Sequence, residues 1–139
     1  MIISTRMIII LILNIVSFVG LDVLWLSTMS GFYSKHLSFV GRYVNGKLKP
    51  IISTSILTWL LLVLGIMIFV YPLVRISSLQ QSIMYGALYG LVVYGVYELT
   101  NYSIIENWPL RIALIDTLWG ITLSAVIACQ TWLLQRLLP

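Results

Sequence analysis

Cysteine and histidine each occur only once in this chain, as Cys129 and His36. A single cysteine cannot form an intrachain disulfide, and one histidine with one cysteine is too few for a zinc site or a multi-histidine iron site. The sequence also contains no glycine-rich phosphate loop and no serine elbow motif, so nucleotide binding and Ser–His–Asp catalysis are not expected. We therefore expect no cofactor and no bound metal.

Charged residues are scarce as well. They make up 9% of the 139 residues, whereas soluble domains contain about 25%. Hydrophobic residues make up 60% of the chain, a composition typical of a membrane protein. The net charge of +4 therefore relates to lipid headgroups and membrane orientation, and we expect no nucleic-acid partner.

Four apolar stretches reach the roughly 20 residues that a bilayer-spanning helix needs. They cover Met7–Met29, Ile51–Tyr71, Ser82–Ile104 and Leu110–Leu134. No small-residue cleavage site ends a short apolar core in the first stretch, so we expect it to be retained and not removed as a signal peptide. The sequence thus predicts an all-α fold in which residues 1–139 form one integral membrane four-helix bundle.

The cations are divided unevenly between the two sides of this bundle. Both termini share one side with Arg6, Arg75 and Arg136, while the other side carries Lys35, Arg42, Lys47, Lys49 and Arg111. The positive-inside rule predicts that the first loop, Ser30–Pro50, is cytoplasmic. Within it, Asn45-Gly46 predicts a turn. The aromatic and basic residues 31–36 fit either an interfacial anchor or a site for an anionic headgroup, which makes Tyr33 a candidate ligand-binding residue.

Three acidic residues lie inside predicted spans: Asp22 in the first, Glu98 in the third and Asp116 in the fourth. A charge near the bilayer centre costs about 2.5–3.5 kcal/mol on insertion scales, so such residues usually have a function. Because successive spans alternate in direction, all three acids are expected at a similar depth, toward the first-loop side. We predict that they form one buried acidic pocket, in which at least one holds a proton and can act as a general acid or base.

Polar and aromatic residues of the third span are predicted to line this pocket. Tyr94, Tyr97 and Asn101 share a helix face with Gly86 and Gly90. The four-residue glycine spacing favours close helix packing, either within the chain or between copies. The second span contains no ionisable group and is expected to serve packing and lipid contact.

A short motif occurs twice, as Asp22-x-x-Trp25 and as Asp116-x-x-Trp119. This spacing puts the indole and the carboxyl on neighbouring positions of one helix face. Trp25 and Trp119 are therefore further candidates for ligand binding, because a tryptophan offers an apolar body and a polar tip.

These residues favour a site that binds or processes a lipid-like or amphiphilic small molecule by carboxyl acid–base chemistry. Whether the protein is an enzyme stays open, and membrane lipid is the expected partner. One alternative is proton-coupled transport of a hydrophobic cation, which would require a homodimer because one four-helix bundle is thin. A second is a structural subunit of a larger assembly, in which every acid is paired. A hard cation held by the three carboxyls and Asn101 is a less favoured alternative.

Several elements resemble one family in the order in which they occur. They are Asp22-x-x-Trp25-Leu26, Phe32-Tyr33, the run from Gly90 to Asn101, Trp108-Pro109 and Asp116-x-x-Trp119-Gly120. In these, and over nearly its whole length, the chain resembles the DUF2177-like proteins, a family of small bacterial membrane proteins of unknown function. One departure is Glu98, where the family pattern has aspartate, so that the carboxyl reaches one methylene further. The resemblance implies a four-span fold in the bacterial inner membrane and implies no activity.

Overall fold

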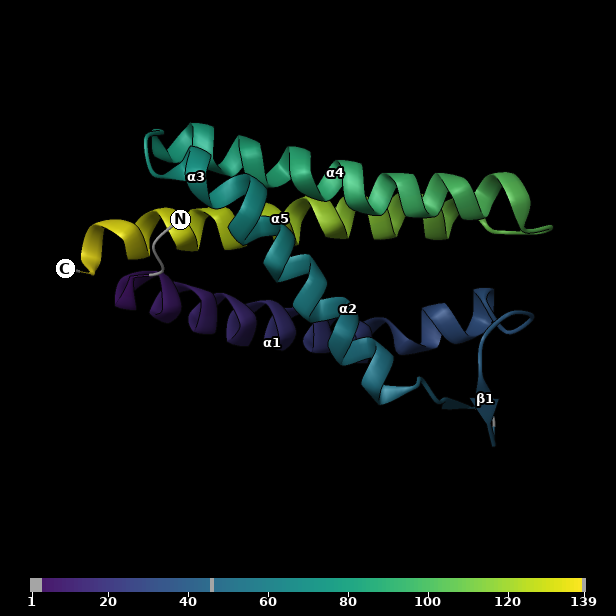
Figure 1. The fold of residues 1–139 in the computed structure, drawn as a ribbon. Helices are drawn as coiled ribbons and strands as arrows, with labels where there is room; N and C mark the ends of the chain where they lie inside the picture. The colour runs from purple at the N-terminus through teal and green to yellow at the C-terminus, as the bar shows by residue number, and fades with distance from the viewer. Residues whose placement is uncertain (1–3, 46, 139) are drawn as a thin grey trace.

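Four helical segments of the computed structural model are long and apolar enough to cross a membrane. The structure describes residues 4–45 and 47–138, and Figure 1 shows how the segments lie. They are α1 (Thr5–His36), a second span over Ile52–Val74, α4 (Leu79–Ile104) and α5 (Leu110–Leu137). Each overlaps one of the predicted spans, so the all-α membrane fold with four spans is confirmed.

Helix α1 extends further than predicted, because the first residues assigned to the loop continue the helix to His36. In this extension Tyr33 is buried in one cluster with Trp108 and Ile112 at the α4–α5 hairpin. Lys35 and His36 occupy the last turn, where positive charge offsets the partial negative charge of a helix C-terminus. Residues 31–36 therefore belong to a packed helix end and not to a loop.

The shortened first loop contains a small antiparallel strand pair, β1 (Tyr43–Val44) and β2 (Lys47–Leu48). Asn45 between them has a φ of 53°, a left-handed conformation that asparagine tolerates better than most residues. The predicted turn is therefore present at Asn45, whereas Gly46 lies outside the described residues. The strands have two residues each, which is too short for an alternating pattern to predict them.

The second span consists of three parts. Helix α2 (Ile52–Gly65) leads into a π turn, η1 (Ile66–Val70), and a short helix, α3 (Tyr71–Val74). In Figure 1 this span crosses the bundle obliquely. Its first part packs against α1, whereas η1 and α3 pack against α4 and α5.

Helices α4 and α5 approach each other closely along two rows of residues spaced by four. On α4 the row is Ser82, Gly86, Gly90, Tyr94 and Glu98, and on α5 it is Asp116, Gly120, Ser124 and Ala128. A Cβ atom on Gly86 would lie 2.4 Å from the Ser124 carbonyl oxygen, and one on Gly90 would lie 2.2 Å from that of Gly120. The glycine pair thus packs α4 against α5 within the chain, one of the two arrangements expected for this spacing.

Two clusters of buried apolar residues hold the bundle together. The larger contains Phe18, Ile66 and Ile127 from three spans, and the smaller surrounds Tyr33 and Trp108 near the α4–α5 hairpin. Asp22 in α1 and Asp116 in α5 each lie, in sequence, between residues of the larger cluster and residues of the smaller one. The candidate site is consequently held from both ends by apolar packing.

Candidate functional site

Asp22, near the middle of α1, accepts two hydrogen bonds from indole groups on different spans. Trp59 of α2 and Trp119 of α5 each donate their Nε1–H group to one of its carboxylate oxygens, both at 2.8 Å. Hydrogen bonds to a carboxylate are stronger than bonds between neutral groups. The side chain of Asp22 therefore joins three spans.

The two Asp-x-x-Trp motifs interlock at this point. Trp119, from the second motif, donates to Asp22 of the first motif. Its ring also stacks on that of Trp25, with the ring centroids 4.5 Å apart and the planes inclined by 3°. The two motifs therefore meet through one hydrogen bond, from Trp119 to Asp22, and one ring stack, between Trp119 and Trp25.

Tyr33 links this aromatic pair to the second aspartate. Its hydroxyl accepts a hydrogen bond of 2.9 Å from Nε1 of Trp25 and donates one to Oδ1 of Asp116. The tyrosine is buried at the end of α1, so this link depends on the helical extension that the sequence did not predict.

Glu98 completes the arrangement from α4. It is 1% exposed, and its Oε2 accepts a hydrogen bond of 3.0 Å from Nε1 of Trp108. Asp116 of α5 is its neighbouring acidic residue.

Glu98 of α4 and Asp116 of α5 are neighbouring acids, and the Tyr33 hydroxyl joins Asp116 to α1. We call Asp22, Glu98 and Asp116 the acidic cluster. Asp22 is connected to Asp116 indirectly, through Trp119, the stacked ring of Trp25 and the hydroxyl of Tyr33. Within residues 4–45 and 47–138, no three Asp, Glu, His or Cys side chains are grouped to hold a metal ion.

Comparison with known proteins gives one match. The family described as "Predicted membrane protein (DUF2177)" matches residues 7–133. The chain belongs to this family. No curated protein and no solved structure matches it. The resemblance seen in the sequence is thus confirmed, and the matched range contains every residue of the acidic cluster in this DUF2177 chain.

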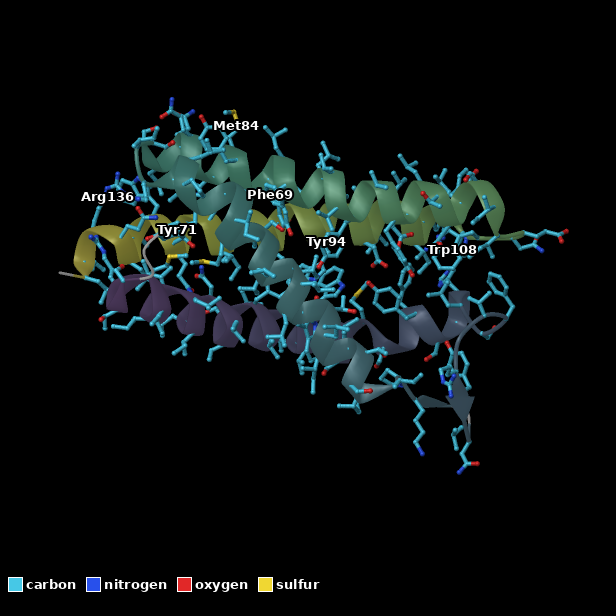
Figure 2. The ribbon with its side chains drawn as sticks, in the orientation of Figure 1. Phe69, Tyr71, Met84, Tyr94, Trp108 and Arg136 are labelled. Carbon is cyan, nitrogen blue, oxygen red and sulfur yellow. The ribbon has the colours of Figure 1, made fainter. Side chains whose placement is uncertain are left out.

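Two further predicted site residues lie about one helical turn to either side of Glu98 on α4. The ring of Tyr94 lies against α5, where a Cβ atom on Gly120 would come within 2.1 Å of it. The amide nitrogen Nδ2 of Asn101 is buried, and no hydrogen-bond acceptor contacts it in the described part of the chain. Figure 2 shows Tyr94 and Trp108 on the side of α5 that faces α1.

Tyr97 does not join the acidic cluster, contrary to the prediction. Its side chain is 61% exposed on the outer surface of α4. The prediction assumed that the Gly86–Gly90 face stays in contact along a straight helix. Instead, the contact row follows every fourth residue and turns by about 40° at each step, so that Glu98 faces α5 at this level. Tyr97 is left facing the bilayer.

Two residues of the site were missed or given another role by the sequence reasoning. Trp59 belongs to the second span, which was expected to provide packing and lipid contact only, yet it donates to Asp22. Trp108 was noted as part of a Trp-Pro element and donates to Glu98. A possible signal was that a buried indole N–H needs an acceptor, and few polar side chains in these spans can provide one.

Proposed function

We propose that the chain binds a lipid-like amphiphile beside the acidic cluster and exchanges a proton with it through the Glu98–Asp116 pair. The position of Glu98 is the observation that carries this proposal, because the residue is 1% exposed and lies within reach of a second carboxyl inside a membrane-spanning bundle. Such a pair is costly to bury in a bilayer, which favours a functional role over a purely structural one.

The surroundings of the pair suit proton exchange. Trp108 donates to Glu98, and Tyr33 donates to Asp116. These neutral donors hold one oxygen of each carboxyl in place, and we propose that the two carboxyls share a proton through their other oxygens. A carboxyl held in this way can give its proton to a ligand and recover it afterwards.

The unpaired groups indicate the chemistry of the ligand. The buried Nδ2 of Asn101 needs an acceptor, such as a hydroxyl, carbonyl or ether oxygen. Three acidic residues in one cluster disfavour a phosphate or carboxylate head. The stacked rings of Trp25 and Trp119, together with Tyr94, supply the apolar surface that an acyl or prenyl chain would contact. We therefore propose a ligand with a neutral or cationic oxygen-bearing head.

Proton-coupled transport of a hydrophobic cation is the second candidate, and a polar layer further along α1 favours it. Asn14 is fully buried, donates to Thr131 at 2.8 Å and accepts from Gln130 at 3.1 Å. Polar groups therefore continue along the α1–α5 contact beyond Asp22. Transport would use a homodimer, which the proposed lipid site does not require.

The proposed membrane is the bacterial inner membrane, with the first loop in the cytoplasm. The support for this orientation is the count of five cations on the first-loop side against three on the side of the termini. The acidic cluster then lies in the half of the bilayer nearer the cytoplasm.

The test is retention of co-purified lipid by Glu98→Gln, compared with Glu106→Gln as a matched control. Glutamine keeps an acceptor oxygen for Trp108 but cannot exchange a proton, whereas Glu106 is exposed in the hairpin. Each variant is purified in mild detergent, and the bound amphiphile is quantified by mass spectrometry together with thermal unfolding.

We expect Glu98→Gln to lose about tenfold in retained amphiphile per protein, which corresponds to about 1.4 kcal/mol. This is the scale of one charge-assisted hydrogen bond. Glu106→Gln should retain wild-type amounts. Unchanged retention in Glu98→Gln would overturn the proposal, and a loss of thermal stability with unchanged retention would favour the structural-subunit alternative.

A further inference from the structure

The second span is packed unevenly on the two sides of its π turn. In α2, Val63 is the one buried residue among 14. Beyond it, three of the five residues of η1 and two of the four residues of α3 are buried. The span is therefore anchored in the bundle by η1 and α3, while α2 lies on the surface of α1.

The junction between these parts has the features of a pivot. Pro72 has no N–H group, and its ring crowds the carbonyl group four residues earlier. The chain accommodates this with a π turn, in which the N–H group of Tyr71 bonds to the Ile66 carbonyl oxygen five residues before it. Sharp bends in helices occur at prolines and at π turns, so a change of direction of the second span is expected at this point.

Tyr89 of α4 contacts the second span just before the π turn. Its hydroxyl donates to the carbonyl oxygen of Leu62 at 3.0 Å. Gly65 provides the space for it, because a Cβ atom there would lie 2.0 Å from the same hydroxyl. The end of α2 is thus fixed at the pivot, and movement of α2 would be a rotation about this contact.

Away from the pivot, α2 is tethered to the acidic cluster by Trp59. The hydroxyls of Thr54, Ser55 and Thr58 bond to carbonyl groups of their own span. In the described part of the chain, two side-chain hydrogen bonds join α2 to other spans: the Tyr89 bond at the pivot and the bond from Trp59 to Asp22. Breaking it would free α2 without breaking any bond of the Glu98–Asp116 pair.

We infer that α2 is a lateral gate, hinged at η1 and closed by the Trp59–Asp22 hydrogen bond, through which a bilayer-resident amphiphile reaches the acidic cluster. This inference rests on the proposed function, and it assigns the ligand to the membrane and not to water. The outer face of α2 carries Leu57, Leu61 and Leu64, which are exposed toward lipid. Rotation of α2 would expose Asp22 and Trp119 to the bilayer, whereas the apolar surface of α2 gives no path for a water-soluble solute.

The experiment measures the movement of α2 and the exchange of lipid in Trp59→Phe. Phenylalanine keeps an aromatic side chain but removes the N–H donor together with part of the indole volume, and the control variant removes the same volume. Trp132→Phe is the matched control, because Trp132 donates to the Ser77 carbonyl oxygen at the opposite end of the bundle. Both are made in a Cys129→Ala background, in lipid nanodiscs, with spin labels on the exposed residues Thr54 and Ser103.

A second label pair on Leu73 and Gln80 reports on the anchored part of the span, where both residues are exposed. We expect Trp59→Phe to broaden the 54–103 distance distribution and leave the 73–80 distribution unchanged. Exchange of a deuterated amphiphile should accelerate roughly three- to twentyfold, the range given by interhelical hydrogen bonds in membranes. Trp132→Phe should change neither measurement.

An unchanged 54–103 distribution in Trp59→Phe, or equal broadening of both pairs, would overturn the gate. If Trp59→Phe does not fold, Asp22→Asn weakens the same bond from the other side and is measured in the same way. The gate and the proposed function fail separately. Unchanged lipid retention in Glu98→Gln would refute the proposed function but not the hinge in α2. An unchanged 54–103 distribution, together with lipid retention that depends on Glu98, would refute only the gate.

Discussion

Replacing Gly90 by alanine tests whether contact between α4 and α5 positions the Glu98–Asp116 pair. The new Cβ atom would lie 2.2 Å from the Gly120 carbonyl oxygen, 2.6 Å from its carbonyl carbon and 2.9 Å from Cα of Ile121. All three atoms are backbone, so no side-chain rotation can relieve the contact. Since an ordinary contact needs about 3.4 Å, the helices must separate by about 1 Å or more.

Gly95→Ala provides a matched control on the same helix. Its Cβ atom would lie 3.8 Å from both Leu91 and Thr117 side-chain atoms, which is an ordinary contact. Both substitutions gain the same helix propensity, about 1 kcal/mol. The difference between the two variants is therefore the packing cost alone, which we expect near the upper end of the usual range of about 1–3 kcal/mol for overpacking.

The measurement is equilibrium unfolding in mixed detergent micelles, followed by tryptophan fluorescence. We expect Gly90→Ala to be less stable than wild type by about 2 kcal/mol, and Gly95→Ala to be equal or slightly more stable. Gly90→Ala should also lose bound amphiphile, because Glu98 lies two turns further along α4. Equal stability of the two variants, or a change of oligomeric state without loss of stability, would refute this packing argument.

Two further predictions concern the pivot and the polar layer. Gly65→Ala should destabilise the protein by about 1–3 kcal/mol. Adding Tyr89→Phe should restore part of this stability, because the closest conflict of the new Cβ atom is with the Tyr89 hydroxyl at 2.0 Å. If the stability losses of the two single variants simply add in the double variant, the prediction is wrong. Thr131→Val removes the acceptor of Asn14 and should cost about 0.6–1.7 kcal/mol in detergent unfolding. Thr122 and Thr131 each donate to a carbonyl group of α5, but of these two only Thr131 also accepts from Asn14. Thr122→Val is therefore the control and should be nearly neutral; equal stability losses in the two variants would show that the polar layer contributes nothing.

Much of the architecture follows from the sequence by itself. Each span is recognisable because a bilayer requires about 20 apolar residues, whichever helices surround it. The alternating direction of the spans also gives the prediction that Asp22, Glu98 and Asp116 lie at similar depth. The spacing of Gly86 and Gly90 predicted a close approach between helices, because a backbone that approaches this closely has no space for a Cβ atom, and the structure identified α5 as the partner.

Only the tertiary structure decided which groups pair with the acids. Tyr97 faces the bilayer and Glu98 faces α5 because the contact row turns around α4, and this rotation depends on how two helices cross. Trp59 reaches Asp22 because α2 lies across α1, and Tyr33 reaches Asp116 because α1 continues as far as the hairpin. Hydropathy and periodicity describe each helix separately, whereas hydrogen-bond partners depend on the crossing, rotation and length of several helices together.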